Sequence, residues 1–384
     1  MSAQSALSVG APPPDRVPLG WLILLPLGAL VLMQVLFAWL DVVPVHNDTL
    51  ADTDAYTRLV RVLDLHATGD WFDSRLLRVN PPEGHVQHWT RPLDALLLCG
   101  AWLLEPVLGF HAGLHLWGVL ISPVFLALAL AALSWAAAPA LGRDARLFAC
   151  LVLLTQPSVL AYTSIGRPDH HSLLLLLCLI LLGLTVRLAL APDDRRIAVL
   201  AGGVAALGVW ISPEALVWLG VSLAALGLFW LGGAPGLARA QRVYLWATTF
   251  GLVIALGLER GRDLSAIEAD RLSLVHVTLL GLLALFWTIV GARGAADLCA
   301  RLATRASRTA RRHPRAFQEP GRPARIAPGI ASRALIATIG VVLIGGLMAI
   351  LFPGLRAGPL GRVDPLYAQI RLANILEIQP LIDA

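Results

Sequence analysis

Residues 167–190 have the sequence RPDHHSLLLLLCLILLGLTVRLAL. The apolar part, Leu173–Leu190, approaches the roughly 20 apolar residues that a transmembrane helix needs, and a second apolar segment, Leu147–Tyr162, ends just before it. Between the two segments lies the charged, metal-capable cluster Arg167–His171. Such a cluster costs stability in a hydrophobic chain unless it lies at a water boundary and serves a purpose. The stretch therefore predicts a membrane protein with a functional turn at one surface.

The composition extends this prediction to the whole chain. Hydrophobic residues make up 57% of the 384 residues and charged residues only 14%, whereas a soluble domain has about 25% charged residues. We therefore predict an all-α polytopic membrane protein with about nine transmembrane helices. The apolar segments assigned to these helices are Trp21–Leu40, Leu114–Ala138, Leu147–Tyr162, Leu173–Leu190, Ile197–Ile211, Ala215–Leu231, Val243–Leu258, Leu272–Val290 and Leu335–Leu351.

The arginines orient these helices, because cytoplasmic loops carry an excess of basic residues. We place the N-terminus in the cytoplasm and the interrupted apolar segment Leu93–Phe110 on the outer surface. Every Arg-rich loop then lies inside, namely 142–146, 193–196, 239–242 and 294–333. The long polar loop after the first helix, the Asp169-His170-His171 cluster and the C-terminal tail all fall on the non-cytoplasmic face.

The same topology gives the domain organisation. We expect residues 1–20 to be a disordered lead-in and residues 21–352 to be the transmembrane domain, with 353–384 in a further outer loop. Within the domain, 41–110 form the first outer loop and 294–333 a basic cytoplasmic loop. Basic loops of this kind contact anionic lipid head groups. We therefore expect the lipid bilayer, and no nucleic acid, as a partner.

The first outer loop carries the densest polar chemistry. From Asp54 onward it predicts an amphipathic helix whose leucines and valines face protein or lipid, while Arg58, Arg61 and Asp64 face water. Asp52 and Asp54 are both suited to cap the start of this helix. One cap explains one acid, so Asp54 is a candidate for catalysis or metal binding. Further along, His88 lies in a proline-rich loop and could contact a sugar or a phosphate, or simply lie on a wet surface.

The cluster offers one carboxylate and two imidazoles within three residues. In an extended chain Asp169 and His171 share a face and can bind a divalent cation. Alternatively, Asp169 caps the following helix and the histidines lie at the interface. In the tail, Glu377 is the one acid of an apolar run on the same side of the membrane.

Three short motifs, in the right order on one face, resemble the catalytic subunit of oligosaccharyltransferase and its archaeal and bacterial relatives in the GT-C glycosyltransferase superfamily. Residues 54–58, DAYTR, approximate the first motif of that family. Asp169-His170-His171 is similar to the archaeal form of the second motif, and residues 374–380, NILEIQP, loosely match the third.

The resemblance implies a metal-dependent transfer of a sugar or oligosaccharide from a polyprenyl phosphate or pyrophosphate to an acceptor. It implies one Mn²⁺ or Mg²⁺ ion at the outer surface, in bacteria the periplasmic face of the inner (plasma) membrane. The implied ligands are Asp54, Asp169, His171 and Glu377, whereas His170 is expected to be a neighbour. Asp54 and Glu377 are also the implied catalytic residues that activate the acceptor. The side chains expected to contact substrate are Arg58, His88, Trp210 and Glu214.

The chain departs from the family at its end. Relatives continue through further helices into a soluble outer domain with a Trp-Trp-Asp motif, whereas this sequence ends at Ala384 and lacks that motif. We therefore expect a shortened relative or a fragment, whose acceptor, a protein or another molecule, the sequence leaves open. The alternatives are a transporter or flippase, which would carry charges near the membrane midplane, and an inactive fragment.

Overall fold

The computed structural model describes residues 16–42, 45, 49–78, 81–261, 263–291 and 328–354. Their elements are α1 (Leu19–Trp39), α2 (Thr53–Thr68), β1 (Arg75–Leu76), β2 (His85–Val86), α3 (Arg91–Leu108), α4 (Phe110–Ala137), α5 (Arg143–Leu154), α6 (Pro157–Thr163), α7 (His170–Leu190), α8 (Arg195–Ile211), α9 (Ala215–Leu231), α10 (Leu237–Arg260), α11 (Leu274–Val290) and α13 (Pro328–Leu351). The two short strands form an antiparallel pair in the first outer loop.

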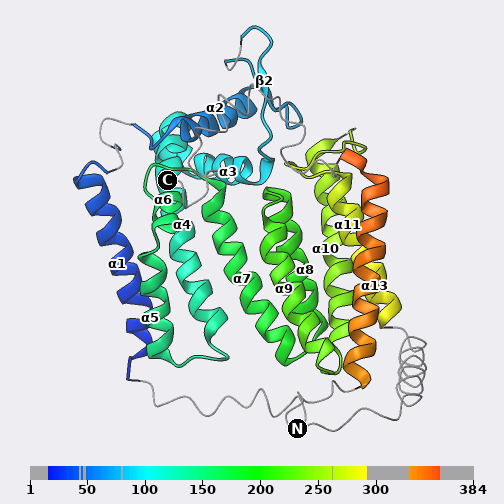
Figure 1. Ribbon diagram of the computed structural model, residues 1–384. Coiled ribbons are helices and arrows are strands. Elements are labelled where there is room, and N and C mark those ends of the chain that lie inside the picture. Colours follow the sequence, from blue (N-terminus) through cyan, green and yellow to red (C-terminus); the bar gives the residue numbers. More distant parts are fainter. Residues whose placement is uncertain are drawn as a thin grey trace, which may run out of the picture.

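Long apolar helices stand side by side in one layer, and α2 and α3 lie across one end of it (Figure 1). Among the described residues, five helices are long and apolar enough to cross a membrane: α1, α4, α7, α10 and α13. The pair α5 and α6, bent by 68°, makes a sixth if it counts as one span. The chain is thus an α-helical protein with several candidate membrane spans.

Each of the nine predicted apolar segments coincides with a helix or, at Leu147–Tyr162, with the bent pair. The remaining three, α8, α9 and α11, have 17 residues each, so the count of nine spans stays a prediction. The bend follows from Pro157, because proline restricts the residue before it and can begin a new helix. Helix α3, predicted to lie on the outer surface, is not among the candidate spans in the described chain.

Aspartates cap the N-termini of α2 and α7, the two helices that carry the acidic candidate residues. Asp52 accepts a bond from Ala55 N at the start of α2, and Asp169 accepts one from His171 N at the start of α7. These carboxylates satisfy backbone N–H groups that have no partner within the helix. Asp52 is thus the N-cap of α2, and Asp54 is not needed to cap this helix.

Buried ion pairs hold α2 against α3. Asp94 on α3 is fully buried, with 0% of its side chain exposed, and pairs with Arg58 at 3.2 Å, Arg61 at 2.7 Å and Arg91 at 3.1 Å. The prediction that Arg58 and Arg61 face water is therefore wrong, whereas Asp64 is exposed as predicted. Two arginines can turn inward because the carboxylate of α3 supplies the opposite charge and accepts their hydrogen bonds.

Replacing Asp94 by Asn should destabilise the protein by about 3–5 kcal/mol, because three buried guanidinium groups lose their counter-charge while the side-chain shape is kept. Denaturant unfolding of the purified protein in detergent measures this loss. Asp64→Asn is the matched control, since Asp64 is an exposed acid on α2, and should change the free energy of unfolding by less than about 0.5 kcal/mol. Equal effects of the two substitutions would contradict the role given to Asp94.

Candidate metal centre

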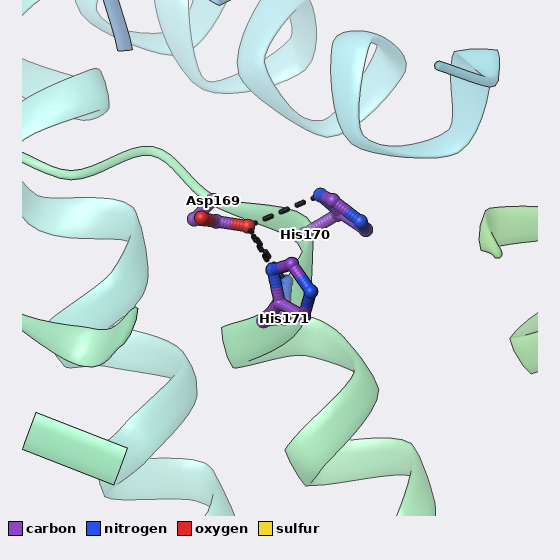
Figure 2. A group of neighbouring side chains, drawn as sticks. All are labelled: Asp169, His170 and His171. Carbon is purple, nitrogen blue, oxygen red and sulfur yellow. Dashed lines mark hydrogen bonds and ion pairs between the residues drawn. The ribbon is translucent and has the colours of Figure 1, made fainter. Parts of the chain in front are cut away.

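The candidate centre is the Asp169-His170-His171 turn at the start of α7. The Nδ1 atoms of His170 and His171 lie 3.1 Å and 2.8 Å from Oδ1 of Asp169. Figure 2 shows both rings turned toward this carboxylate. One ligand atom from each residue lies within 4.8 Å of the other two, and all three side chains are partly buried. Helix capping and clustering are therefore compatible, because a single oxygen does both.

The turn is fixed from below by α4 and α1. Ser122 of α4 is fully buried, and its hydroxyl contacts Arg167 O, Asp169 N and the Ser172 hydroxyl. On the other side, Gln34 of α1 donates to Thr163 O and accepts from Ile165 N. Two candidate membrane helices thus hold the backbone that carries the three candidate ligands, so the ligands are preorganised.

The histidines stabilise the negative charges of the neighbouring carboxylates, Asp169 and Glu214. Burial alone would raise the pKa of Asp169, but hydrogen bonds from His170 and His171 hold this pKa far below its usual range. Nε2 of His171 lies 3.4 Å from Oε2 of Glu214. The hydrogen bond from His171 also lowers the pKa of Glu214. Both nitrogens of His171 therefore face a carboxylate, and Asp169 stays ionised.

The side chains present fit a divalent cation. One carboxylate oxygen and two imidazole nitrogens form a mixed donor set, and three protein ligands leave coordination positions for water or a phosphate oxygen. Imidazole nitrogen suits Mn²⁺ or Zn²⁺ better than Mg²⁺, which prefers oxygen ligands in a strict octahedron. We expected His170 to be a neighbour, but its Nδ1 lies inside the group.

The acids of α2 lie next to this centre. Oδ2 of Asp52 is 3.1 Å from Nε of Arg167, which is itself 3.5 Å from Oδ2 of Asp169. Asp54 is exposed in the first turn of α2. Partial desolvation and the nearby charges of Asp52 and Asp169 raise the pKa of Asp54. Asp54 is not one of the three clustered ligands, so its predicted role in a site shared with Asp169 stays a prediction.

The predicted substrate contacts lie at the same end of the molecule. The guanidinium of Arg58 lies 4.1 Å from the ring centre of Trp89, and Arg58 lines a small cavity of about 10 Å³ together with His170. His88 is exposed beside Trp89, with ring centres 6.0 Å apart. Because Arg58 is buried and His88 is exposed, only His88 of these two can contact a substrate from solvent.

Trp210, in the last turn of α8, and Glu214, at the start of α9, have different partners. The indole of Trp210 donates to Glu259, whose carboxylate also accepts from Arg91 N and pairs with Arg271. Trp210 therefore helps to join α8, α10 and α3. Glu214 instead lies against His171, a partnership that sequence spacing could not indicate.

One expected ligand cannot be placed, and two residues near the site were not expected to act there. Glu377 lies outside the described residues. Arg167 was named in the charged cluster but was given no role in the site. Ser122 was not predicted as part of the site, because a single serine in an apolar helix gave no signal.

No family model and no curated protein matches the sequence. Solved structures of an archaeal oligosaccharyltransferase from Archaeoglobus fulgidus do match in fold. The complex with Zn and sulfate has a TM-score of 0.65 and 15% identity over 87% of this chain. The apo form has a TM-score of 0.62 and 16% identity over 94% of this chain.

A third structure, AglB with an inhibitory peptide and a dolichol-phosphate, has a TM-score of 0.64 and 15% identity over 92% of this chain. The chain spans 40% of the length of each of these three structures. The expected resemblance to oligosaccharyltransferase is therefore confirmed as a likeness of fold.

Proposed function

We propose that this protein is a membrane glycosyltransferase. It would move a sugar or oligosaccharide from a polyprenyl phosphate or pyrophosphate to an acceptor on the non-cytoplasmic face. The observation that carries the proposal is the Asp169-His170-His171 group at the end of the helical layer, next to Asp54, in an oligosaccharyltransferase-like fold. In bacteria this face would be the periplasmic side of the inner membrane.

The centre has the chemistry that such a transfer needs. A departing phosphate gains negative charge, and a bound divalent ion would stabilise that charge. Asp169, His170 and His171 would hold the ion, and their nitrogen-rich set favours Mn²⁺ over Mg²⁺. Zn is present in one structural neighbour. Glu377 keeps its place as an expected ligand from a segment outside the described residues.

Asp54 is suited to the acceptor. It is exposed, it lies near Asp169, and its raised pKa reflects a carboxylate that gains from a proton or a cation. A carboxylate with these properties can hold the acceptor nucleophile and take its proton. One neighbouring structure holds a tethered acceptor peptide, so a peptide is one acceptor class to examine.

The donor would approach from the lipid. One neighbouring structure contains a dolichol-phosphate, and the centre lies at the end of candidate membrane helices. A lipid-borne phosphate could therefore reach it from the membrane surface, with the exposed His88 near the sugar. The charged groups lie at the starts of α2 and α7, which favours a transferase over a transporter, whose charges would lie near the membrane midplane.

We predict that the purified protein binds Mn²⁺ and that Asp169→Asn weakens this binding at least about 100-fold. Asparagine can still cap α7 but carries no charge for the ion. Electron paramagnetic resonance of free Mn²⁺ measures the affinity. Asp193→Asn, an exposed acid at the start of another loop, should bind as the wild type does. If the Asp169→Asn variant bound Mn²⁺ as tightly as the wild type, this turn would not be the metal site.

The rate of sugar transfer should fall about 100-fold or more in Asp54→Asn and in Asp169→Asn. This is the range expected when a proton acceptor or charge stabilisation is lost. The assay follows label from a synthetic polyprenyl phosphate sugar in proteoliposomes, with peptide and membrane extract as acceptor sources. Asp64→Asn should keep wild-type activity. Solute uptake without any sugar transfer would instead identify a transporter.

Glu214 is expected to orient His171. If Nδ1 of His171 binds the ion, Nε2 donates toward Glu214, and such carboxylate partners contribute about 10- to 100-fold in metal affinity. Glu214→Gln should therefore weaken Mn²⁺ binding within that range, while the exposed Glu105→Gln should not. If Glu214→Gln left the Mn²⁺ affinity unchanged but raised the KM for the donor, Glu214 would bind substrate and would not orient His171.

A further inference from the structure

Arg167 lies where the first outer loop meets the candidate metal centre. Its Nε is 3.1 Å from Oδ2 of Asp52 and 3.5 Å from Oδ2 of Asp169. The two aspartates cap α2 and α7, respectively. One guanidinium therefore contacts the caps of two helices that are far apart in sequence.

The contact uses the oxygen of Asp169 that the histidines leave free. His170 and His171 face Oδ1, whereas Arg167 faces Oδ2. Nε of Arg167 makes no hydrogen bond, so its effect on Oδ2 is the attraction of a nearby positive charge. This attraction favours the carboxylate orientation in which Oδ1 faces the histidine rings. Arg167 thus orients a candidate ligand without competing for its metal-facing oxygen.

The guanidinium is itself held in place. Its NH1 donates to Ala161 O at 3.0 Å, and its central carbon lies 4.7 Å from the ring centre of Tyr162. The Tyr162 ring also packs against His171, with ring centres 4.4 Å apart. Next to the ion pair, Ala51 N donates to Gly166 O at 3.0 Å. Arg167 is therefore a fixed cation and not a mobile surface side chain.

The acids around it would otherwise repel one another. Asp52, Asp54 and Asp169 are mutually close enough for their charges to interact. The Arg58–Asp94 pair anchors α2 farther along the helix, so the first turn depends on local contacts. A positive charge between Asp52 and Asp169 offsets this repulsion at the point where α2 begins.

We propose that Arg167 is a positioning residue that clamps the first turn of α2 to the metal-binding turn, and so sets both the place of Asp54 and the orientation of Asp169. The inference rests on the proposed function for its catalytic meaning. The clamp itself is a structural property that can be tested without substrate.

Hydrogen–deuterium exchange of peptides covering residues 50–58 tests the clamp in the full chain without added metal. Arg167→Gln removes the cation, and Asp52→Asn removes one arm of the clamp while asparagine still caps α2. Both should speed exchange in this segment by about fivefold, the upper range for a partly exposed ion pair. The double variant should exchange no faster than Arg167→Gln alone, because both substitutions break the same contact.

Arg187→Gln is the matched control. Arg187 lies near the other end of α7 and stacks on Trp135 at 3.8 Å, so its loss should leave residues 50–58 unchanged. Wild-type exchange in both Arg167→Gln and Asp52→Asn would overturn the clamp. Additive effects in the double variant would likewise contradict it.

A second readout separates orientation from charge. Arg167→Lys keeps the positive charge but loses the fixed planar geometry, so Mn²⁺ affinity should fall about tenfold, as for other groups that orient a metal ligand. Asp52→Asn should keep near wild-type affinity, because Arg167 still holds Asp169. Unchanged affinity in Arg167→Lys would overturn the orienting role. If the wild type bound no ion, the proposed function would fail, while the exchange result would still decide the clamp.

Discussion

The buried carboxylate of Asp94 is the contact on which the polar end of the molecule depends. Three arginines from α2 and the start of α3 converge on it. Burying that many charges is favourable only when each has partners, so the cluster fixes α2 against α3 at a defined height above the helical layer. Because Asp52 and Asp54 lie at the start of α2, the same cluster holds the helix that carries them, while local contacts at Arg167 fix its first turn. A contact with no chemical role thus positions the helix on which the candidate site depends.

Helices and their polar end could be predicted from the sequence because both follow from local properties. Apolar length predicts each membrane helix, and the alternation of Arg-rich and acidic loops brings distant acids to one end. The structure agrees: Asp52, Asp169 and Glu214 lie there together. Span counts are harder, since a helix of 17 residues such as α9 can be either a short span or a packed core helix.

The errors have a common physical origin, which is the long-range partner. Arg58 and Arg61 lie on a helix with an apolar face, so their charges predict exposure, yet a carboxylate 36 and 33 residues away, respectively, draws them inward. Glu214 and His171 likewise meet only because α7 and the α8–α9 turn end at the same level. His170 was expected to be only a neighbour of the ligands. The capping turn instead lets both rings reach one oxygen.

Capping also separates the acids that the fold needs from the acid that it does not. Asp52 and Asp169 satisfy backbone N–H groups at the starts of α2 and α7, so their presence has a structural explanation even before any chemistry. Asp54 has no such explanation. The positive end of α2 favours a carboxylate in its first turn, but Asp52 and Asp169 oppose it, and the cap is already supplied. An acid whose neighbours disfavour its charge is a candidate functional group, which is why the proposed function assigns Asp54 to the acceptor.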